Sequence, residues 1–405
     1  MVFPNTSYVP LKDGFYSFLK RQLNSCVWRK IYNSDEYDVI RAIDALRLSE
    51  SDFSALLSPA AIPYLEKIAH RARNETINHF GYTIQLFTPL YLANYCTNKC
   101  VYCGFNAERK IDRNMLNIDQ VEREAKSIAG TGLRNILALT GDAVGKTGIS
   151  YLTSCVEVLS GYFSSVGIEV PSMTESEYAE AISAGTYSMT IFQETYNERL
   201  YEDLHPAGPK RNFVFRLDAP QRAVKAGMRA VNLGSLLGLD DWRRDIFFTG
   251  LHASFLQQCY PELEISISLP RLRPYEENSS GHWHKFYPQT VTDKDFVQAL
   301  LAIRCFMPQV GITLSTREPA WLRDKLITIG VTKMSAGVST SVGGYSDSDT
   351  ENKKRKSSQF EISDQRSVDE IVNVLKSMGY QAIYSDWQLP GNSNMYGKYG
   401  QKAVI

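Results

Sequence analysis

From Tyr82 onward, short apolar runs rich in β-branched residues alternate with stretches whose apolar positions recur at helical spacing. Eight of the short runs predict strands: Gln85–Leu92, Asn135–Thr140, Gly167–Ser172, Ser188–Glu194, Ala230–Ser235, Glu264–Leu269, Gly311–Ser315 and Val331–Ala336. The stretches between them predict helices, among them Asp119–Ile128, Tyr151–Phe163, Glu177–Ala184, Phe296–Phe306 and Pro319–Ile327. This alternation indicates an α/β protein with a parallel sheet, and eight strands are the number that closes a (β/α)8 TIM-type barrel.

An open, doubly wound sheet is the alternative interpretation of the same alternation. The turn after the first predicted strand has no Gly-x-Gly-x-x-Gly sequence, which such sheets use to bind dinucleotides. The pattern therefore favours the closed barrel. In a barrel of this kind the active site lies at the carboxyl ends of the strands.

The barrel is predicted to span residues 81–345, between a helical N-terminal extension (1–80) and a C-terminal extension (346–405). In the N-terminal part, Ser51 and Ser58 are the expected N-caps, because serine accepts hydrogen bonds from the first amides of a helix. Helical spacing then continues to Phe80, and Gly81 ends the helix.

The C-terminal extension is predicted to contain one helix, Val368–Met378, followed by Gln381–Trp387 and a Gly- and Asn-containing tail, Gly391–Ile405. Two irregular segments precede it. Tyr275–Gln289 is a long loop that could act as a lid or form an ordinary surface loop. Ser346–Ser358 contains a basic run and is expected to be a solvated loop.

Composition narrows the choice of partners. The chain has 44 basic and 44 acidic residues and a net charge of zero, so nothing indicates a nucleic acid or an anionic membrane as partner. No apolar run is long enough for a spanning helix, and the first residues lack the features of a signal peptide. We expect a cytoplasmic protein in which the scattered cysteines stay reduced, namely Cys26, Cys155, Cys259 and Cys305.

Polar or glycine-containing motifs follow every predicted strand, which is where a barrel has its active site. In chain order they are the loop Cys96–Cys103, Thr140-Gly141-Asp142, Glu175-Ser176-Glu177, Gln193-Glu194-Thr195-Tyr196, Gly234-Ser235, Pro270-Arg271-Leu272-Arg273-Pro274, Ser315-Thr316-Arg317-Glu318 and Ser335-Ala336-Gly337.

The loop after the first strand contains Cys96, Cys100 and Cys103 in the spacing Cys-x₃-Cys-x₂-Cys. Thiolates bind soft metals and iron–sulfur clusters. A structural zinc site needs four ligands, and the chain has no second cysteine pair to complete one. Three thiolates on a four-iron cluster would leave one iron open to a substrate or cofactor. The pattern favours a catalytic cluster, while a zinc site with a distant fourth ligand and a chance grouping stay open.

With Tyr102 and Phe105 beside the third cysteine, the loop resembles the signature of the radical S-adenosylmethionine (SAM) enzymes. Within these, the chain is similar to the tyrosine lyases of thiamine thiazole biosynthesis, the 2-iminoacetate synthase family. Segments that carry the resemblance span most of the chain: Leu56–Ala61, Pro89–Asn94, Gln193–Tyr196, Ser268–Pro274, Leu314–Glu318, Gly343–Tyr345 and Asp386-Trp387.

Two neighbouring families share part of this pattern. The tyrosine lyase of hydrogenase maturation has a second cysteine cluster near its C-terminus, whereas this chain has no cysteine after Cys305. The tryptophan lyase of antibiotic biosynthesis lacks the Tyr-Cys-Gly-Phe ending of the cysteine loop. The chain departs from the family that it resembles at Asp142, where that family usually has glutamate, and the shorter side chain changes the reach of the carboxylate.

The resemblance implies that Cys96, Cys100 and Cys103 hold a 4Fe-4S cluster whose fourth iron binds SAM. It also implies that Gly141 and Asp142 contact the amino group of SAM. The other residues that the resemblance implies for SAM are Glu175, Glu194, Arg216 and Phe105. The two glutamates could instead cap a helix or form an ion pair. Arg216 could instead be a surface charge.

The implied substrate is free L-tyrosine, with Arg317 binding its carboxylate through a planar guanidinium. Tyr91, Arg317 and Ser335 are the expected catalytic residues. The substrate-binding residues are expected to be Tyr91, Arg271, Ser315, Thr316, Arg317 and Ser335. A pair with Glu318 is the structural alternative for Arg317.

The implied products are 2-iminoacetate and p-cresol, and the implied partners are a reductant such as flavodoxin or ferredoxin and the thiazole synthase. Two alternatives stay open. One is a related lyase that acts on tryptophan or another aromatic amino acid. The other is a barrel that binds a ligand without catalysis and completes its metal site with a fourth protein ligand.

Overall fold

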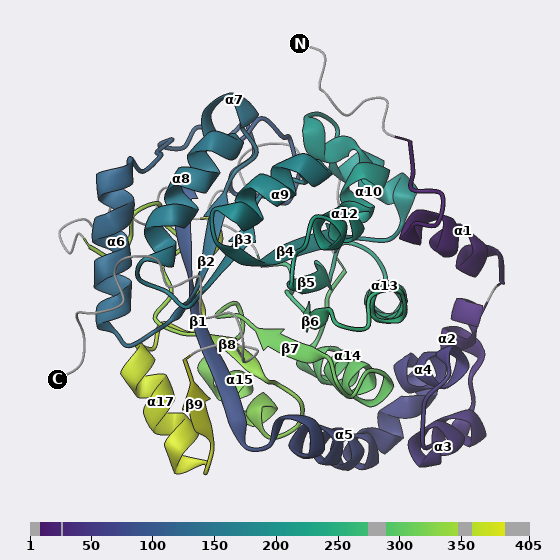
Figure 1. Ribbon diagram of the computed structural model, residues 1–405. Helices are drawn as coiled ribbons and strands as arrows, with labels where there is room; N and C mark the ends of the chain where they lie inside the picture. Colours follow the sequence, from purple (N-terminus) through teal and green to yellow (C-terminus); the bar gives the residue numbers. More distant parts are fainter. Residues whose placement is uncertain (1–8, 26, 274–288, 347–358, 385–405) are drawn as a thin grey trace.

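The protein is a closed parallel barrel, described by a computed structural model for residues 9–25, 27–273, 289–346 and 359–384 (Figure 1). Strands β2 to β8 are neighbours in chain order, and β1 pairs with both β8 and β2, which closes the barrel. The strands are β1 (Thr83–Ala93), β2 (Asn135–Thr140), β3 (Ser165–Glu169), β4 (Thr186–Glu194), β5 (Ala230–Ser235), β6 (Glu264–Ser268), β7 (Gly311–Leu314) and β8 (Lys333–Ser335). The predicted (β/α)8 fold is confirmed.

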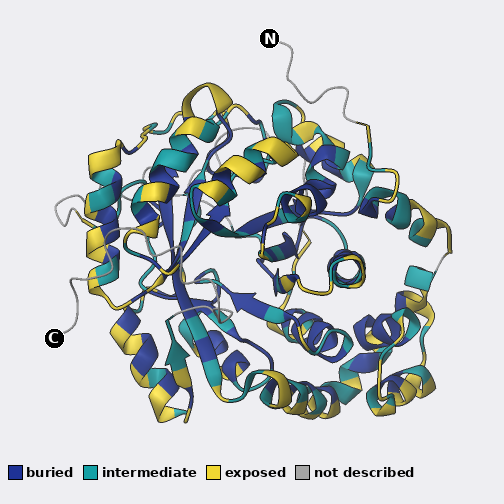
Figure 2. Ribbon diagram, viewed as in Figure 1, coloured by how far each residue is buried: buried dark blue, intermediate teal, exposed yellow. Residues whose placement is uncertain are grey.

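Helices cover the outside of the barrel, with their exposed residues facing away from the strands (Figure 2). In α6, buried residues recur at helical spacing from Val121 to Ile128, so one face of this helix packs inward. The helices that follow the strands are α6 (Ile118–Gly130), α7 (Val144–Thr147), α8 (Ile149–Ser160), α9 (Glu175–Ser183), α10 (Glu198–Leu204), η3 (Pro209–Arg211), α11 (Phe213–Leu217), α12 (Ala219–Lys225), α13 (Trp242–Cys259), α14 (Asp293–Phe306) and α15 (Ala320–Ile327).

The predicted bounds of β2 and β5 match the structure residue for residue, but β3 ends earlier than predicted. Its last residue is Glu169, which pairs with Leu139 of β2, whereas the prediction extended the strand to Ser172. Pro171 has no amide hydrogen and cannot continue the ladder. The polar residue at the carboxyl end of this strand is therefore Glu169.

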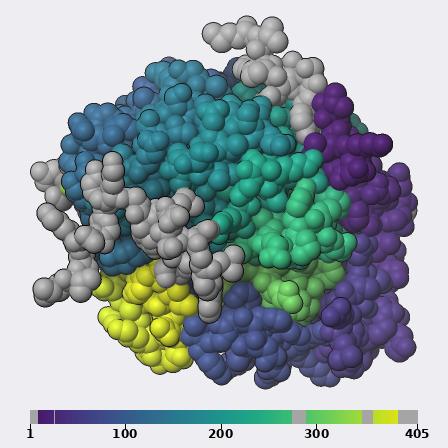
Figure 3. Space-filling model, in the orientation of Figure 1, coloured from purple at the N-terminus to yellow at the C-terminus, as the bar shows by residue number. Residues whose placement is uncertain are grey.

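The N-terminal helices lie along one side of the barrel (purple in Figure 3). Helices α4 and α5 pack on α14, where Gln298 Nε2 donates hydrogen bonds of 2.9 and 2.8 Å to the carbonyls of Leu56 and Ser58. The elements are α1 (Phe15–Ser25), η1 (Val27–Arg29), α2 (Lys30–Asn33), α3 (Glu36–Asp44), α4 (Glu50–Leu57), η2 (Pro59–Tyr64) and α5 (Leu65–Phe80).

Of the two predicted N-caps in this region, Ser51 is wrong and Ser58 is right in position only. Ser49 caps α4, because its side chain accepts from the amide of Asp52 in a capping box, and Ser51 lies inside the helix. Ser58 lies between α4 and η2 and is the N-cap residue of η2, with Pro59 next to it, but its side chain makes no capping hydrogen bond. The predicted helix up to Phe80 is divided into η2 and α5, and Pro63 lies within η2.

The C-terminal segment adds a helix and one more strand to the barrel. β9 (Gln381–Ile383) pairs with the start of β1, and α17 (Val368–Ser377) precedes it. Gln85 pairs with Lys333 of β8 and with Ile383 of β9, so these two strands lie on opposite edges of β1. The end of the described chain is thereby attached to the strand that precedes the cysteine loop.

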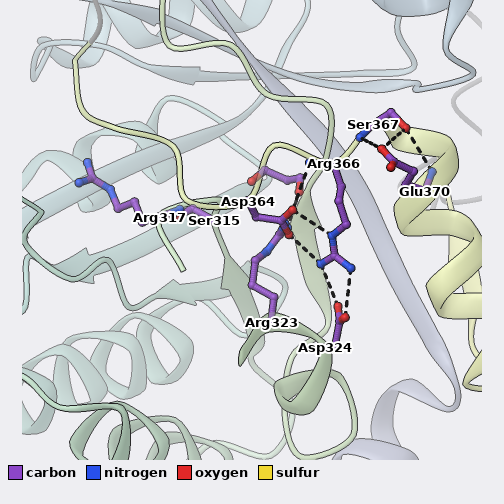
Figure 4. Close-up of polar contacts among 9 residues, drawn as sticks. Ser315, Arg317, Arg323, Asp324, Asp364, Arg366, Ser367 and Glu370 are labelled. Atoms are coloured by element: carbon purple, nitrogen blue, oxygen red, sulfur yellow. Dashed lines mark hydrogen bonds and ion pairs between the residues drawn. The ribbon is translucent and has the colours of Figure 1, made fainter. Parts of the chain in front are cut away.

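A buried ion-pair network joins this segment to α15 (Figure 4). The Arg323 guanidinium binds the Asp364 carboxylate, and both side chains are fully buried. Arg366 pairs with Asp364 at 2.7 Å and with Asp324 at 2.9 Å. Arg323 also donates to the carbonyl of Ser335 at the end of β8. The network therefore fixes the backbone near Asp364 against the barrel mouth.

Replacing Asp364 with alanine is expected to lower the free energy of unfolding by about 3–5 kcal/mol, because the Arg323 charge would be buried without its partner. Urea titrations of both proteins measure the change. Glu361→Ala is the matched control, since Glu361 is exposed on the same segment; its effect should stay within about 0.5 kcal/mol. Equal effects of the two substitutions would contradict a structural role for the network.

Several predictions concern residues outside the described ranges. They include the lid or surface loop over Tyr275–Gln289, the solvated loop over Ser346–Ser358 and the tail Gly391–Ile405, apart from the described edge residues Gln289 and Ser346. Within the described residues, no helix has the length and apolar character needed to cross a bilayer. Cys155, Cys259 and Cys305 are free thiols.

Candidate active site

A cavity opens at the carboxyl ends of the barrel strands, and every strand from β1 to β8 contributes to its lining. The contributing residues at the strand ends include Tyr91, Leu139, Glu169, Glu194, Asn232, Ser268, Leu314 and Ser335. The cavity therefore lies where the fold predicts an active site.

The three clustered cysteines line this cavity on the loop that follows β1. Cys100 is buried, and Cys96 and Cys103 are half-buried. Arg113 fixes the loop from outside: its guanidinium donates to the carbonyls of Asn94, Phe105 and Asn106 at 2.6–2.9 Å. The loop therefore presents its thiols to the cavity from a fixed backbone.

Burial raises the pKa of the Cys96 and Cys100 thiols, and the nearby Cys103 raises both further. Neutral thiols are thus favoured until a cation compensates the thiolate charge. Within the described ranges, no three His, Cys, Asp or Glu side chains are gathered around one point that a single ion could occupy. A four-iron cluster holds each of its ligands on a different iron, so the thiols need not meet at one point. The arrangement of the three cysteines is therefore compatible with a cluster.

Gly141 and Asp142 follow β2 and pack against the cysteine loop. A Cβ atom on Gly141 would lie 2.2 Å from the carbonyl oxygen of Tyr95, so only glycine permits this approach. Asp142 Oδ2 accepts from Asn98 Nδ2 at 2.7 Å, while its Oδ1 is buried and has no hydrogen-bond partner. Burial also raises the pKa of Asp142. A ligand amino group could satisfy Oδ1 as donor.

Glu194 ends β4 at a β-bulge and is held in a strained conformation. Its φ of 72° makes it the one non-glycine residue with positive φ in the described chain. Such strain persists where the surroundings enforce it, typically at functional sites. Lys210 Nζ lies 2.5 Å from the Glu194 carboxylate and Arg216 Nη2 lies 3.7 Å from it. This group of three charges lines the cavity beside the cysteines.

Arg317 follows β7 and lines the cavity without a carboxylate partner among the described residues. Its guanidinium lies 3.5 Å from the ring centroid of Phe360 and points away from the Arg323 network (Figure 4). Burial lowers the pKa of Arg317, while the charges of Tyr91 and Glu169 oppose this. The group nonetheless stays cationic, since arginine does not lose its proton in proteins.

The structural alternative for Arg317, a pair with Glu318, does not occur in the described chain. Glu318 instead binds Arg271 through both carboxylate oxygens and Arg273 at 3.0 Å. Arg271 also pairs with Asp293 at 2.7 Å and does not line the cavity, so its position does not support the predicted substrate contact. Arg273 lines the cavity in its place.

Tyr91 is buried at the end of β1, where its ring meets that of Phe105 edge-on, 5.9 Å away. Its hydroxyl donates to Gln359 Oε1 at 2.8 Å. Gln359 and Phe360 both line the cavity, although the sequence analysis assigned no function to either. No local motif marks these two residues, because their contacts come from strands far away in the chain.

Ser315, Thr316 and Ser335 also line the cavity. Ser335 Oγ is buried and lacks a hydrogen-bond partner, so it is available to a ligand. Thr316 uses its carbonyl to accept from the amides of Ser363 and Asp364. Ser315 Oγ accepts from the Arg317 amide at 3.4 Å.

Glu175 is not brought to the cavity: it is exposed in the first turn of α9. Glu169 lines the cavity instead, although the strand predicted for Gly167–Ser172 placed it inside the strand and not at its end. The Val170-Pro171 step was the available signal, since proline ends a buried strand. Burial and the nearby Glu194 charge raise the pKa of Glu169 to about 7.

The comparisons with known proteins agree with this geometry. A model of the radical SAM superfamily matches residues 90–248, and a model of the Biotin and Thiamin Synthesis associated domain matches residues 268–381. The barrel, the three-thiolate loop and these matches define the chain as a radical SAM enzyme.

The 2-iminoacetate synthases of Escherichia coli (strain K12) and Salmonella typhimurium (strain LT2) are each 37% identical to the chain over 352 residues. The alignments cover 86% of this chain and 90% of each relative. A crystal structure of HydG, a maturase of the FeFe-hydrogenase, has a TM-score of 0.82 at 30% identity, covering 92% of this chain and 81% of HydG. The chain belongs to the 2-iminoacetate synthase family.

The cofactors of this family, a 4Fe-4S cluster and SAM, fit the residues of the cavity. The donor set suits them, because thiolates ligate iron–sulfur clusters and three of them leave one iron open. The buried, unpartnered Asp142 Oδ1 suits an amino group, and Gly141 lets the β2 end approach the cysteine loop closely. Both residues border the cavity together with Cys96, Cys100 and Cys103.

Proposed function

We propose that the protein is a carbon–carbon lyase that cleaves the Cα–Cβ bond of L-tyrosine to 2-iminoacetate and p-cresol. SAM is converted to 5′-deoxyadenosine and methionine in the same reaction, and 2-iminoacetate serves thiamine thiazole biosynthesis. The observation that carries the proposal is one cavity that contains both the three-thiolate loop and Arg317, a cation without a carboxylate partner in the described chain. The 2-iminoacetate synthases that are 37% identical to the chain support it.

The cysteine side of the cavity holds the cofactors. When bound, they would supply the radical chemistry needed to remove a hydrogen atom from the amino group of tyrosine. Cys96, Cys100 and Cys103 would hold the cluster, and Asp142 would accept a hydrogen bond from the amino group of SAM. Glu194 and Arg216 would bind the other polar groups of SAM.

The part of the cavity lining that follows β7 and β8 binds tyrosine. The Arg317 guanidinium forms two parallel hydrogen bonds with the substrate carboxylate, and Phe360 beneath it fixes its plane. The unpartnered Ser335 Oγ adds a donor, and Ser315 lies beside Arg317 in the same lining. The substrate backbone is thus anchored before the reaction starts.

Tyr91 and Phe105 give the side of the cavity between these two regions an aromatic surface for the substrate ring. The Tyr91 hydroxyl is engaged by Gln359, which limits its rotation. Burial raises the pKa of Tyr91 well above its usual value, so the phenol stays neutral. Tyr91 therefore acts as a neutral hydrogen-bonding group next to the reacting bond.

The reaction needs partners beyond the substrate. The cluster has to be reduced, and we assign this to a small electron carrier such as flavodoxin or ferredoxin. The product imine reacts with water, so we expect direct transfer to the thiazole synthase. We place the reaction in the cytoplasm, where thiols stay reduced.

An anaerobic turnover assay tests the function. The cluster is reconstituted, dithionite and SAM are added, and either L-tyrosine or L-tryptophan is offered. We expect 5′-deoxyadenosine and p-cresol with tyrosine and no cleavage product with tryptophan. Indole-derived products from tryptophan without p-cresol would identify the related tryptophan lyase activity instead. Intact SAM with both amino acids would refute an enzymatic role.

A further inference from the structure

The cavity contains four carboxylates and four cationic side chains among the described residues. Glu194 is paired with Lys210 and Arg216, and Glu318 is paired with Arg273. Asp142 accepts from Asn98. Within the described chain this leaves one carboxylate without a hydrogen bond or ion pair, that of Glu169, and one cation without a carboxylate, that of Arg317.

Glu169 and Arg317 belong to opposite parts of the barrel and do not neutralise each other. Glu169 ends β3 and Arg317 follows β7, which are four strands apart in the closed order. No ion pair joins them, yet each charge influences the pKa of the other and of Tyr91. An anion and a cation therefore face the same space beside Tyr91.

The molecule that complements this arrangement is a free α-amino acid, because its ammonium and carboxylate groups carry the matching opposite charges. SAM also carries such a pair, but our proposed function assigns its amino group to Asp142 next to the cysteines. Glu169 and Arg317 are therefore available to the second amino acid, the substrate. This step rests on the proposed function.

We propose that Glu169 is a catalytic residue that binds the ammonium group of the substrate and removes one proton from it. The proton moves from the substrate nitrogen to a carboxylate oxygen of Glu169, and the nitrogen keeps the electron pair. The products of this step are a neutral amine and a neutral carboxylic acid. Loss of a hydrogen atom from the neutral amine leaves a neutral nitrogen radical, whereas loss from the ammonium group would leave a positively charged one.

The surroundings of Glu169 suit a general base. Burial and Glu194 on β4 raise its pKa, while Arg317, Arg216 and Lys210 oppose the rise, which leaves the pKa at about 7. A base is most effective when its pKa lies near the working pH. The carboxylate is therefore available above about pH 7, and the substrate proton can be accepted at neutral pH.

Glu169→Gln tests the inference by equilibrium binding, without turnover. The holoenzyme, loaded with cluster and SAM but not reduced, is titrated with L-tyrosine and with 3-(4-hydroxyphenyl)propionate, which lacks the amino group. We expect the unmodified enzyme to prefer tyrosine about tenfold or more, and the variant to bind both ligands almost equally. Unchanged preference in the variant would overturn the contact with the ammonium group.

Turnover gives the second measurement. Glu169→Gln should lower kcat/KM for tyrosine by about 10²–10³-fold. The activity of the unmodified enzyme should rise through about pH 7 and level off as Glu169 loses its proton. The residual activity of the variant should keep rising toward the pKa of the free amino group of tyrosine, because solvent then has to remove the proton.

Glu169→Asp and Glu180→Gln complete the design. Aspartate keeps the base, so partial activity with the original pH profile is expected even if glutamine perturbs the fold. Glu180 is exposed on α9, and its change should leave binding and turnover unaltered. A Glu169→Gln enzyme with unchanged kcat/KM and pH profile would refute the inference, whereas absence of p-cresol from the unmodified enzyme would refute the proposed function instead.

Discussion

Replacing Cys100 with alanine is expected to abolish SAM cleavage. Cys100 is the buried member of the three-thiolate loop, and two remaining thiolates cannot replace it as a cluster ligand. The loop itself should keep its backbone, because Asn106 Nδ2 donates to the Cys100 carbonyl and Arg113 holds the neighbouring carbonyls. The measurements are iron and sulfide content after reconstitution and 5′-deoxyadenosine formation with dithionite.

Cys259→Ala is the matched control for this substitution. Cys259 is a free, exposed thiol at the end of α13, away from the cavity lining. Its removal should change neither the iron content nor SAM cleavage. Retained SAM cleavage in Cys100→Ala would show that the cluster has other ligands than the three loop cysteines.

Replacing Arg317 with alanine is expected to lower kcat/KM for tyrosine by about 30- to 5,000-fold. This corresponds to the roughly 2–5 kcal/mol lost when one partner of a desolvated charge pair is removed. The substrate carboxylate would face Phe360 and the other side chains of the lining without a cation to balance it. Arg317→Lys should retain intermediate activity, since it keeps the charge but loses the planar fork.

Tyramine, which lacks the carboxylate, separates this effect from general damage. The unmodified enzyme should bind tyrosine far more tightly than tyramine, and Arg317→Ala should bind them about equally. Arg211→Ala serves as the control, because Arg211 is exposed on η3. A variant of Arg317 that still distinguishes tyrosine from tyramine would assign the carboxylate to another residue.

Arg317 and Glu169 are proposed to bind the two charged groups of the same substrate, its carboxylate and its ammonium group. Each is the residue left over when the other cavity charges have found partners within the described chain. Removal of each should erase discrimination against a different substrate analogue, tyramine for Arg317 and the deamino acid for Glu169. The paired experiments therefore determine the orientation of the amino acid in the cavity.

The C-terminal segment has a specific share in the site. Gln359 contacts Tyr91, Phe360 contacts Arg317, and the buried pair of Arg323 and Asp364 holds the following backbone. Loss of the Arg323–Asp364 pair should therefore affect the part of the cavity around Arg317 and Tyr91 more than the part around the cysteines. This is why Asp364→Ala is informative for tyrosine affinity as well as for stability.

The sequence by itself determined the barrel and the side of it that carries the chemistry. Eight apolar runs separated by helical patterns need a closed parallel sheet to bury both strand faces, and the polar residues then gather at the carboxyl ends. The spacing of Cys96, Cys100 and Cys103 is local, so it is visible without a fold. Short-range periodicity sets the strands and helices, and the barrel predicted from them is confirmed.

Only the tertiary structure decided which charged residues face the cavity. Glu169 lines the cavity and Glu175 does not, because β3 ends at Glu169, before Pro171, and Glu175 already belongs to the exposed start of α9. Arg317 differs from Arg271 because Glu318 binds Arg271 and Arg273 from another strand. Gln359 and Phe360 reach the site from far along the chain. Pairing between distant strands depends on packing, which local sequence does not encode.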